Sequence, residues 1–423
     1  MPASNPQNAL FRPPALIAAL ALLAALYEWA LFATTFTHPG SIGPNYNTPG
    51  TDWMVFYTAA HSYWQGHLAI LADGGRFTAL LNQSFSHLLT QPLSSRPWIA
   101  PPSLLLVLLP FGLLGFAASY ALFQLASAGA LLASLRVGAS DPKSAWAIGL
   151  AAILCPAAAL SAVDGQTGFF IAALLIGGFR LMEKRPVTAG LLFGLLTVKP
   201  QYFVLVPIAL IAARQWKALL ATFVAALALT AASALLFGFE PWLLWFHKVL
   251  AGDPQWIAHG RLWGNSIYAS AVTLGATNGF ASALQAAGLL AGAAAIYAGF
   301  RRIREGELKC ALLLATAFLV APHSGPYEAM LPVVAGALWL KHAKPPVEMW
   351  RWLIVLAIWL IPLVSPPAII APGRFAPLLL MALTALIFVD GSKKAVPPTE
   401  KSVARIFRSR AAAARPPQGG RQI

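Results

Sequence analysis

The chain has 423 residues, of which 58% are hydrophobic and 10% are charged, whereas soluble domains carry about 25% charged residues. This composition excludes a large soluble domain and predicts an all-α integral membrane protein. The net charge of +15 would suit a nucleic-acid partner, but the basic residues lie in short clusters between apolar runs. Such clusters are typical of the cytoplasmic loops of membrane proteins, so we expect no nucleic acid.

The first apolar run, over about 14–36, predicts an outward membrane span that acts as a signal anchor. It is too long for a signal peptide and lacks a clear small-x-small cleavage site. A long external segment follows over about 37–100. The next apolar stretch, about 103–115, is interrupted by Pro110 and two glycines, which predicts a helix that enters the membrane only halfway.

The later apolar runs are separated by short polar turns and basic clusters, and they predict about eleven further spans. With the first span this makes about twelve membrane helices and places both termini in the cytoplasm. Several runs are shorter than about 17 residues, so the helices must tilt or the bilayer must thin locally. The predicted runs are 116–135, 145–163, 167–182, 187–198, 201–213, 217–238, 279–300, 310–321, 327–340, 350–364 and 375–389, with a second external segment over about 239–278.

This topology distributes the polar residues unevenly: 23 of the 29 Lys and Arg residues fall inside, and seven of the eight histidines fall outside. The membrane domain is expected over 1–390, and 391–423 is expected to form a basic, disordered cytoplasmic tail close to anionic lipid. Half of the 14 tryptophans lie in the two external segments. They indicate either an aromatic belt at the membrane interface or, with His and Arg, a sugar-and-phosphate site on the membrane surface.

Six of the 14 acidic residues fall outside in this topology, so the candidates for an external catalytic carboxylate are few. Five of them have a simple structural explanation, and the sixth is Asp52. Asp73 and Asp253 are expected in turns, Asp164 as a helix cap, and Glu240 and Glu328 at helix N-termini.

Asp52 lies in the stretch "GTDWMVFYT", shortly after the first span and directly before a row of aromatic residues. A helix that starts at Trp53 predicts an amphipathic surface lying along the membrane. Asp52 is then either the N-cap of this helix or a catalytic base at the external face, and its position alone leaves both open. The residues expected on the aromatic face are Trp53, Phe56, Tyr57, Ala60, Tyr63 and Trp64.

Lys199 is an ionisable residue between two apolar runs, in "GLLTVKPQYFVLVP". A lysine at membrane depth indicates either a functional site or a side chain that snorkels to the interface. Pro200 suits the first position of a helix, whose free N–H groups would lie beside Lys199 and form a phosphate site. Two more helices are expected to begin at the same face, after Gln166 and after "PHSGPYE", the stretch that includes His323 and Tyr327.

Six stretches along the chain together resemble glycosyltransferase family 87, a family of polytopic C-type glycosyltransferases that includes polyprenol-phosphate-mannose-dependent mannosyltransferases. The resemblance implies the C-type fold, with amphipathic helices in the first external loop. It also implies that Asp52 is the catalytic aspartate, that Lys199 is the lysine of the "KPQ" motif, and that His323 is the histidine before the late hairpin. The stretches are "DWMVFYTAAHSYWQG", "WIAPPSLLLVLLPFGLL", "DGQTGFFIAALLIGGF", "AGLLFGLLTVKPQYFVLVPIAL", "GNSIYAS" and "PHSGPYEAMLPVVAGALWL".

The function implied by the resemblance is transfer of a sugar, with mannose expected, from a polyprenyl-phosphate donor to a lipid or glycan acceptor. The enzyme would lie in the inner (plasma) membrane, with its active site on the periplasmic side and membrane lipid as a partner. One carboxylate suffices for a single inverting displacement, because a retaining mechanism normally needs a second carboxylate as nucleophile. Neither a metal nor another cofactor is expected. The expected donor-phosphate residues are Lys199, Gln201, Arg261 and His323, and the expected substrate contacts are Tyr57, His61, Gln166, Asn265 and Tyr327.

Two other functional classes stay open at this stage. A transporter or flippase of a lipid-linked precursor would use Lys199 and Pro200 as a broken helix at a midplane site. The chain has no evident internal repeat, however, and a transporter has no need of about 64 external residues after its first span. A non-catalytic scaffold for envelope assembly is the third interpretation.

Overall fold

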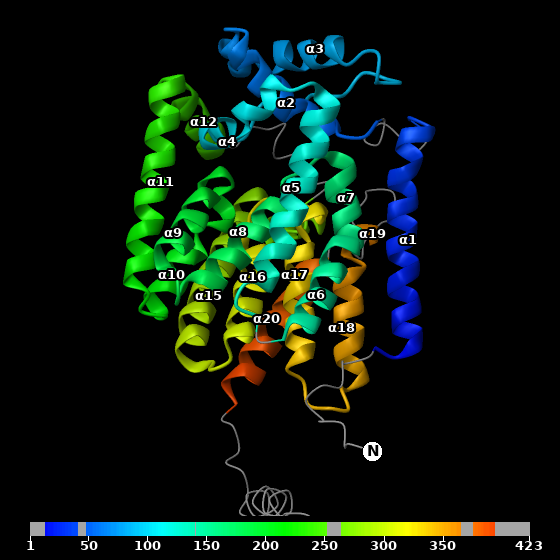
Figure 1. The fold of residues 1–423 in the computed structure, drawn as a ribbon, viewed down its shortest axis with the longest axis vertical. Helices are drawn as coiled ribbons and strands as arrows, with labels where there is room; N and C mark the ends of the chain where they lie inside the picture. Colours follow the sequence, from blue (N-terminus) through cyan, green and yellow to red (C-terminus); the bar gives the residue numbers. More distant parts are fainter. Residues whose placement is uncertain (1–12, 41–47, 140, 252–263, 365–374, 394–423) are drawn as a thin grey trace, which may run out of the picture.

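A computed structural model describes residues 13–40, 48–139, 141–251, 264–364 and 375–393, and every regular element in these ranges is helical (Figure 1). The N-terminal half contains α1 (Ala15–Thr37), α2 (Thr51–Trp64), η3 (Leu68–Ala72), α3 (Gly74–Ser84), α4 (Pro102–Leu108), η4 (Leu109–Leu113), α5 (Phe116–Arg136), α6 (Pro142–Leu154), α7 (Pro156–Asp164), α8 (Gly168–Leu181), α9 (Pro186–Gly194) and η5 (Leu195–Val198). The C-terminal half contains η6 (Pro200–Tyr202), α10 (Leu205–Ala212), α11 (Trp216–Phe237), α12 (Glu240–Ala251), α14 (Ile267–Thr273), α15 (Asn278–Arg302), α16 (Gly306–Val320), η7 (Pro326–Glu328), α17 (Met330–Lys341), α18 (Met349–Trp359), α19 (Ile361–Val364) and α20 (Ala376–Ser392).

Four of the described helices, α1, α5, α11 and α15, are long and apolar enough to cross a membrane. They expose large apolar side chains, such as Leu125 on α5 (73% exposed) and Leu235 on α11 (86% exposed). A surface of this kind is stable against lipid and would be unfavourable in water. The chain is therefore a multi-pass membrane protein, while the full number of twelve spans and the C-type fold remain predictions.

Three helices, α8, α16 and α17, form the centre of the bundle (Figure 1). Every residue over 310–320 of α16 is buried, and α8 and α17 bury almost all of theirs. A helix that is apolar on all sides is stable only when other helices surround it, which explains why these segments occupy the interior.

Ion pairs join the helix ends that the sequence assigns to the cytoplasm. Glu307, at the start of α16, lies 3.3 Å from Arg180 at the end of α8 and 2.7 Å from Lys341 at the end of α17. Arg351, in the first turn of α18, lies 2.5 Å from Asp390 near the end of α20. These ends lie opposite α2, α3 and α12, so the basic clusters gather at one end of the bundle (Figure 1).

Two predicted spans are interrupted. The predicted run 145–163 is a pair of helices, α6 and α7, that meet at Cys155 with a bend of 52°. Pro156 has no N–H to continue the helix and forces the preceding residue into an extended conformation. The predicted run 350–364 is likewise divided into α18 and α19 at Leu360, two residues before Pro362.

The predicted hairpin is present, with α9 and η5 on one side, η6 and α10 on the other, and Lys199 between them. Its first arm spans Pro186–Val198, whereas the neighbouring helix α11 has 22 residues. The tip of the hairpin therefore ends below the level of α2, α4 and α12 (Figure 1).

Candidate active site

Buried contacts of Trp53 fix the start of α2. This side chain is completely buried, donates a hydrogen bond from Nε1 to Oγ of Ser119 at 3.0 Å, and stacks on Phe123 at a centroid distance of 4.6 Å. The N-cap of α2 is Gly50, which has a φ of 79°, and Asp52 lies in the first turn of the helix. The alternative that Asp52 is an N-cap is therefore wrong, and its carboxylate is free to contact other elements.

The carboxylate of Asp52 contacts two residues from distant parts of the chain. Its Oδ2 atom accepts a hydrogen bond from Nε2 of Gln166 at 2.6 Å, and its Oδ1 atom lies 3.8 Å from Nε of Arg96. Gln166 is held in turn by Gln124, whose Nε2 donates to the Gln166 carbonyl at 3.0 Å. Gly165, at a φ of 75°, brings the turn so close to Trp53 that a Cβ atom there would overlap it. Asp52 and Gln166 are thus both part of a rigid junction.

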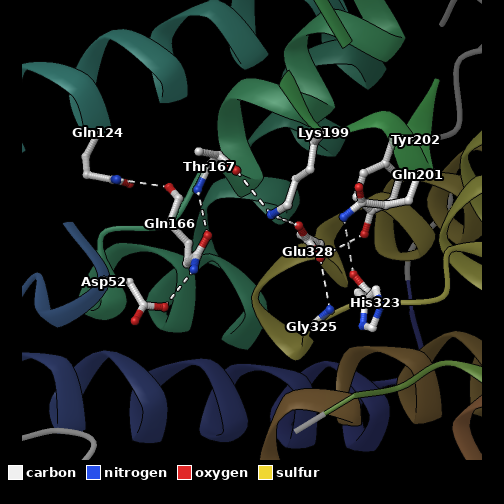
Figure 2. Close-up of polar contacts among 10 residues, drawn as sticks. All are labelled: Asp52, Gln124, Gln166, Thr167, Lys199, Gln201, Tyr202, His323, Gly325 and Glu328. Atoms are coloured by element: carbon white, nitrogen blue, oxygen red, sulfur yellow. Dashed lines mark hydrogen bonds and ion pairs between the residues drawn. The ribbon is translucent and has the colours of Figure 1, made fainter. Parts of the chain in front are cut away.

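A chain of polar contacts leads from Asp52 to Lys199 at the hairpin tip (Figure 2). The backbone N–H of Thr167 donates to Oε1 of Gln166 at 3.3 Å. Nζ of Lys199 donates to Oγ1 of Thr167 at 3.2 Å and forms an ion pair with Glu328. Asp52, Gln166 and Lys199 were all expected at the site, and the structure places them in one connected network.

Glu328 is the buried counter-ion of Lys199, which the sequence analysis did not recognise. Its side chain is 1% exposed and accepts further hydrogen bonds from the Tyr202 hydroxyl at 2.8 Å and the Gly325 N–H at 2.9 Å. A buried carboxylate is tolerated only when it is paired in this way. Glu328 could have been predicted from the sequence, because a lysine at membrane depth usually has an acidic partner.

Four other expected residues lie around the loop before Glu328. Nε2 of Gln201 is 3.5 Å from the His323 carbonyl, and the Asn265 N–H donates to the Ser324 carbonyl at 2.9 Å. The Tyr327 ring lies 5.3 Å from Nζ of Lys199. Burial lowers the pKa of His323 to about 4, so its imidazole is neutral at neutral pH. A neutral imidazole can donate a hydrogen bond to a phosphate but adds no positive charge.

Tyr57 and His61 point toward a different part of the molecule. The Tyr57 hydroxyl donates to the Leu114 carbonyl at 3.0 Å, and Nδ1 of His61 lies 2.9 Å from the Gly112 carbonyl. These contacts fasten α2 to η4 and the residue that follows it. His61 is roughly 13 Å along the helix axis from Asp52, at nine residues of 1.5 Å each. Arg261, the remaining expected phosphate residue, lies outside the described residues.

The other acidic residues of the predicted external segments have only some of the structural roles expected from the sequence. Asp73 is the N-cap of α3 and accepts a hydrogen bond from the Arg76 N–H at 3.0 Å, so its assignment to a turn was wrong. Asp164 ends α7, while Thr167 precedes α8, so Asp164 is not the expected helix cap. It lies close enough to Asp52 and Arg96 for their charges to act on it. Glu240 begins α12 as predicted, and Asp253 lies outside the described residues.

An apolar cavity of about 430 Å³ adjoins the hairpin tip on the side of α11 and α12. Trp242, on α12, donates from Nε1 to Oγ of Ser233 on α11 at 3.1 Å, which holds the wall of the cavity in place. The cavity is lined by Thr197, Pro200, Thr230, Ala234, Phe239, Trp242, Leu243, Trp245 and Phe246. We call it the aromatic groove. Two of its lining residues, Thr197 and Pro200, flank Lys199 in the chain.

Metal-binding side chains do not gather in the part of the chain that the structure describes: no three His, Cys, Asp or Glu residues there come close enough to share an ion. That the activity does not depend on a metal ion remains a prediction.

Comparison with known proteins identifies the family. The profile of glycosyltransferase family 87 matches residues 98–322, just over half of the chain. This range includes Gln166, Lys199 and Gln201, whereas Asp52 precedes it and Glu328 follows it. No curated protein and no solved structure matches the chain. The chain belongs to glycosyltransferase family 87 and is a multi-pass membrane glycosyltransferase.

Proposed function

We propose that this enzyme transfers a sugar, with mannose as the expected one, from a polyprenyl-phosphate donor to a lipid or glycan acceptor. The reaction would take place at the periplasmic face of the inner (plasma) membrane. The observation that carries the proposal is the polar network from Asp52 to Lys199, because it connects a carboxylate to a cation that lies beside the aromatic groove.

Asp52 is the proposed catalytic base. Its carboxylate accepts the proton of the acceptor hydroxyl while the hydroxyl oxygen attacks the anomeric carbon of the sugar. The bond from that carbon to the phosphate oxygen breaks at the same time, and its electron pair leaves with the phosphate. The hydrogen bond from Gln166 holds one carboxylate oxygen and leaves the other for the acceptor. General-base catalysis of this kind contributes about 10²–10⁴-fold to the rate.

The donor is proposed to lie with its phosphate at the hairpin tip and its isoprenoid chain in the aromatic groove. The groove suits an isoprenoid because its walls carry Trp, Phe and Leu side chains, and it adjoins Pro200, the residue after Lys199. Lys199, Gln201, Arg261 and His323 are the proposed phosphate contacts. Gln166, Asn265 and Tyr327 are proposed to contact the sugar or the acceptor, with Tyr57 and His61 as further substrate contacts.

A transfer assay on the purified full chain in lipid nanodiscs tests this proposal. The donor is a synthetic polyprenyl-phosphate mannose with a radiolabelled sugar, and the acceptor is a lipid extract of the source membrane. We expect labelled lipid-linked glycan to form, and the same glycan to be absent from lipids of a deletion strain. A protein that moves the labelled donor across vesicle membranes without forming a glycosylated product would be a flippase instead.

A further inference from the structure

Arg96 is a partly buried cation beside Asp52, and its Nε donor has no hydrogen-bond partner in the described part of the chain. Its side chain is 13% exposed, and its Nε atom is buried and makes no hydrogen bond within the described part of the chain. The contact to Asp52, at 3.8 Å, is longer than the 2.7–3.2 Å of an N–H···O hydrogen bond. Arg96 was not among the site residues expected from the sequence.

The backbone around Arg96 is held by contacts with α3 and α2. The Arg96 N–H donates to Oγ1 of Thr78 on α3 at 2.9 Å. Trp98, two residues later, is 8% exposed and meets Phe56 of α2 edge to face at 6.3 Å. A buried N–H donor without a partner is destabilising. These contacts keep such a donor beside the proposed base, which indicates that a ligand supplies the partner.

The charges of the site indicate the kind of ligand. The charge of Lys199 is matched by Glu328, which is buried and paired with it. A phosphate near Asp52 and Asp164 would be repelled by these carboxylates unless a cation beside them offset their charge. Among the described residues, Arg96 lies beside Asp52 with a donor still unused. A guanidinium presents five N–H donors in a planar fork that matches two phosphate oxygens.

We propose that Arg96 binds the phosphate of the lipid-linked donor and stabilises the negative charge that builds on it as the sugar leaves. This inference rests on the proposed function. As the bond between the anomeric carbon and the phosphate oxygen breaks, the electron pair passes to the phosphate, and the guanidinium offsets the new charge. The same guanidinium lies beside Asp52 and reduces the repulsion between its carboxylate and the phosphate.

Equilibrium binding to the purified full chain in detergent tests this role without requiring turnover. The probes are farnesyl phosphate, which has a short isoprenoid and a phosphate, and farnesol, which lacks the phosphate. The variants are Arg96→Gln, which removes the charge, and Arg96→Lys, which keeps the charge but loses the fork. Arg76→Gln is the matched control, because Arg76 lies on α3 of the same external segment and its side chain is 84% exposed.

We expect Arg96→Gln to weaken farnesyl phosphate binding by at least about 10-fold, Arg96→Lys to weaken it less, and Arg76→Gln to leave it unchanged. Farnesol binding should be the same in all four proteins. Equal affinity of wild type and Arg96→Gln for farnesyl phosphate would overturn the role of Arg96 and leave the proposed function intact. Loss of both ligands together in Arg96→Gln would show a structural role and also overturn it. Wild-type protein that does not prefer farnesyl phosphate to farnesol would contradict the phosphate donor itself, and the inference with it.

Discussion

The side-chain amide of Gln166 donates a hydrogen bond to the carboxylate of Asp52 at 2.6 Å, although 114 residues separate the two in sequence. Asp52 lies in the first turn of α2, and Gln166 lies at the junction of α7 and α8. The bond therefore ties the proposed base to the centre of the membrane bundle. Because it uses one carboxylate oxygen, it also fixes the direction in which the second oxygen can accept a proton.

Gln166→Leu should lower the rate of transfer, because the carboxylate of Asp52 would lose the donor that orients it. A hydrogen bond to a charged group contributes about 1.5–3 kcal/mol, which corresponds to a loss of roughly 10–100-fold in kcat. Steady-state kinetics at saturating donor and acceptor should show this loss. Gln83→Leu, at an exposed position on α3, is the control and should retain full activity. Wild-type kcat in Gln166→Leu would mean that Asp52 needs no orienting donor.

Lys199→Met should destabilise the protein, because Glu328 would remain buried without its cation. Removing one partner of a buried ion pair costs about 3–5 kcal/mol. The double variant Lys199→Met/Glu328→Gln should recover much of the stability, since no buried charge is left. Thermal unfolding of wild type, Lys199→Met, Glu328→Gln and the double variant in detergent gives the coupling energy between the two residues. Additive losses in the double variant would show that the pair does not act as a unit.

The same lysine should also be required for binding the donor phosphate. Lys199→Met should therefore bind donor far more weakly than wild type, and the stabilised double variant should not recover that binding. Lys199→Arg should retain part of it, because the charge remains while the geometry changes. Equal donor affinity of wild type and Lys199→Met would remove Lys199 from the donor site.

His323 should make the stability of the protein depend on pH below neutrality. Burial lowers the pKa of this side chain from 6.5 to about 4 in the folded state. Between these two pH values the unfolded chain binds more protons than the folded chain, so stability must fall as the pH is lowered from 6.5 to 4. Thermal unfolding measured across this range should show a smaller loss for His323→Gln than for wild type. An identical pH dependence in the two proteins would contradict a buried, neutral His323.

The predicted topology can be tested with reporter fusions. A fusion after Gln65, just beyond α2, should report an external position, and a fusion after Lys184, just beyond α8, a cytoplasmic one. The physical basis is the excess of Lys and Arg on one side, 23 against 6. The opposite result for either fusion would place the proposed active site on the wrong side of the membrane.

Most helices were predictable from the sequence because each long apolar run, bounded by polar or basic residues, corresponds to one helix. The predicted run 217–238 is α11 (Trp216–Phe237), and 116–135 is α5 (Phe116–Arg136). Hydropathy averages over a window, however, and a single residue can interrupt a helix without changing that average. The breaks at Cys155 and Leu360 are of this kind, since each depends on a nearby proline.

The site was predictable to the extent that an unusual residue type identified it. Asp52 and Lys199 are conspicuous because acids and buried lysines are rare in this chain. Glu328 was missed because its position at a helix N-terminus is a sufficient explanation in sequence, while its pairing with Lys199 spans 129 residues. Arg96 was missed for a related reason, since only the fold shows that this arginine is partly buried beside Asp52.

The rate of sugar transfer by Asp52→Asn tests the central claim most directly. Asparagine keeps the size of the side chain and can still accept the hydrogen bond from Gln166, so folding and donor binding should be preserved. It cannot accept a proton from the acceptor, so transfer should fall by about 10²-fold or more, and Asp52→Glu should be impaired because its carboxylate is displaced. Transfer at a near wild-type rate by Asp52→Asn, with unchanged donor binding, would contradict the account and assign the base to another carboxylate, Asp164 or Glu328.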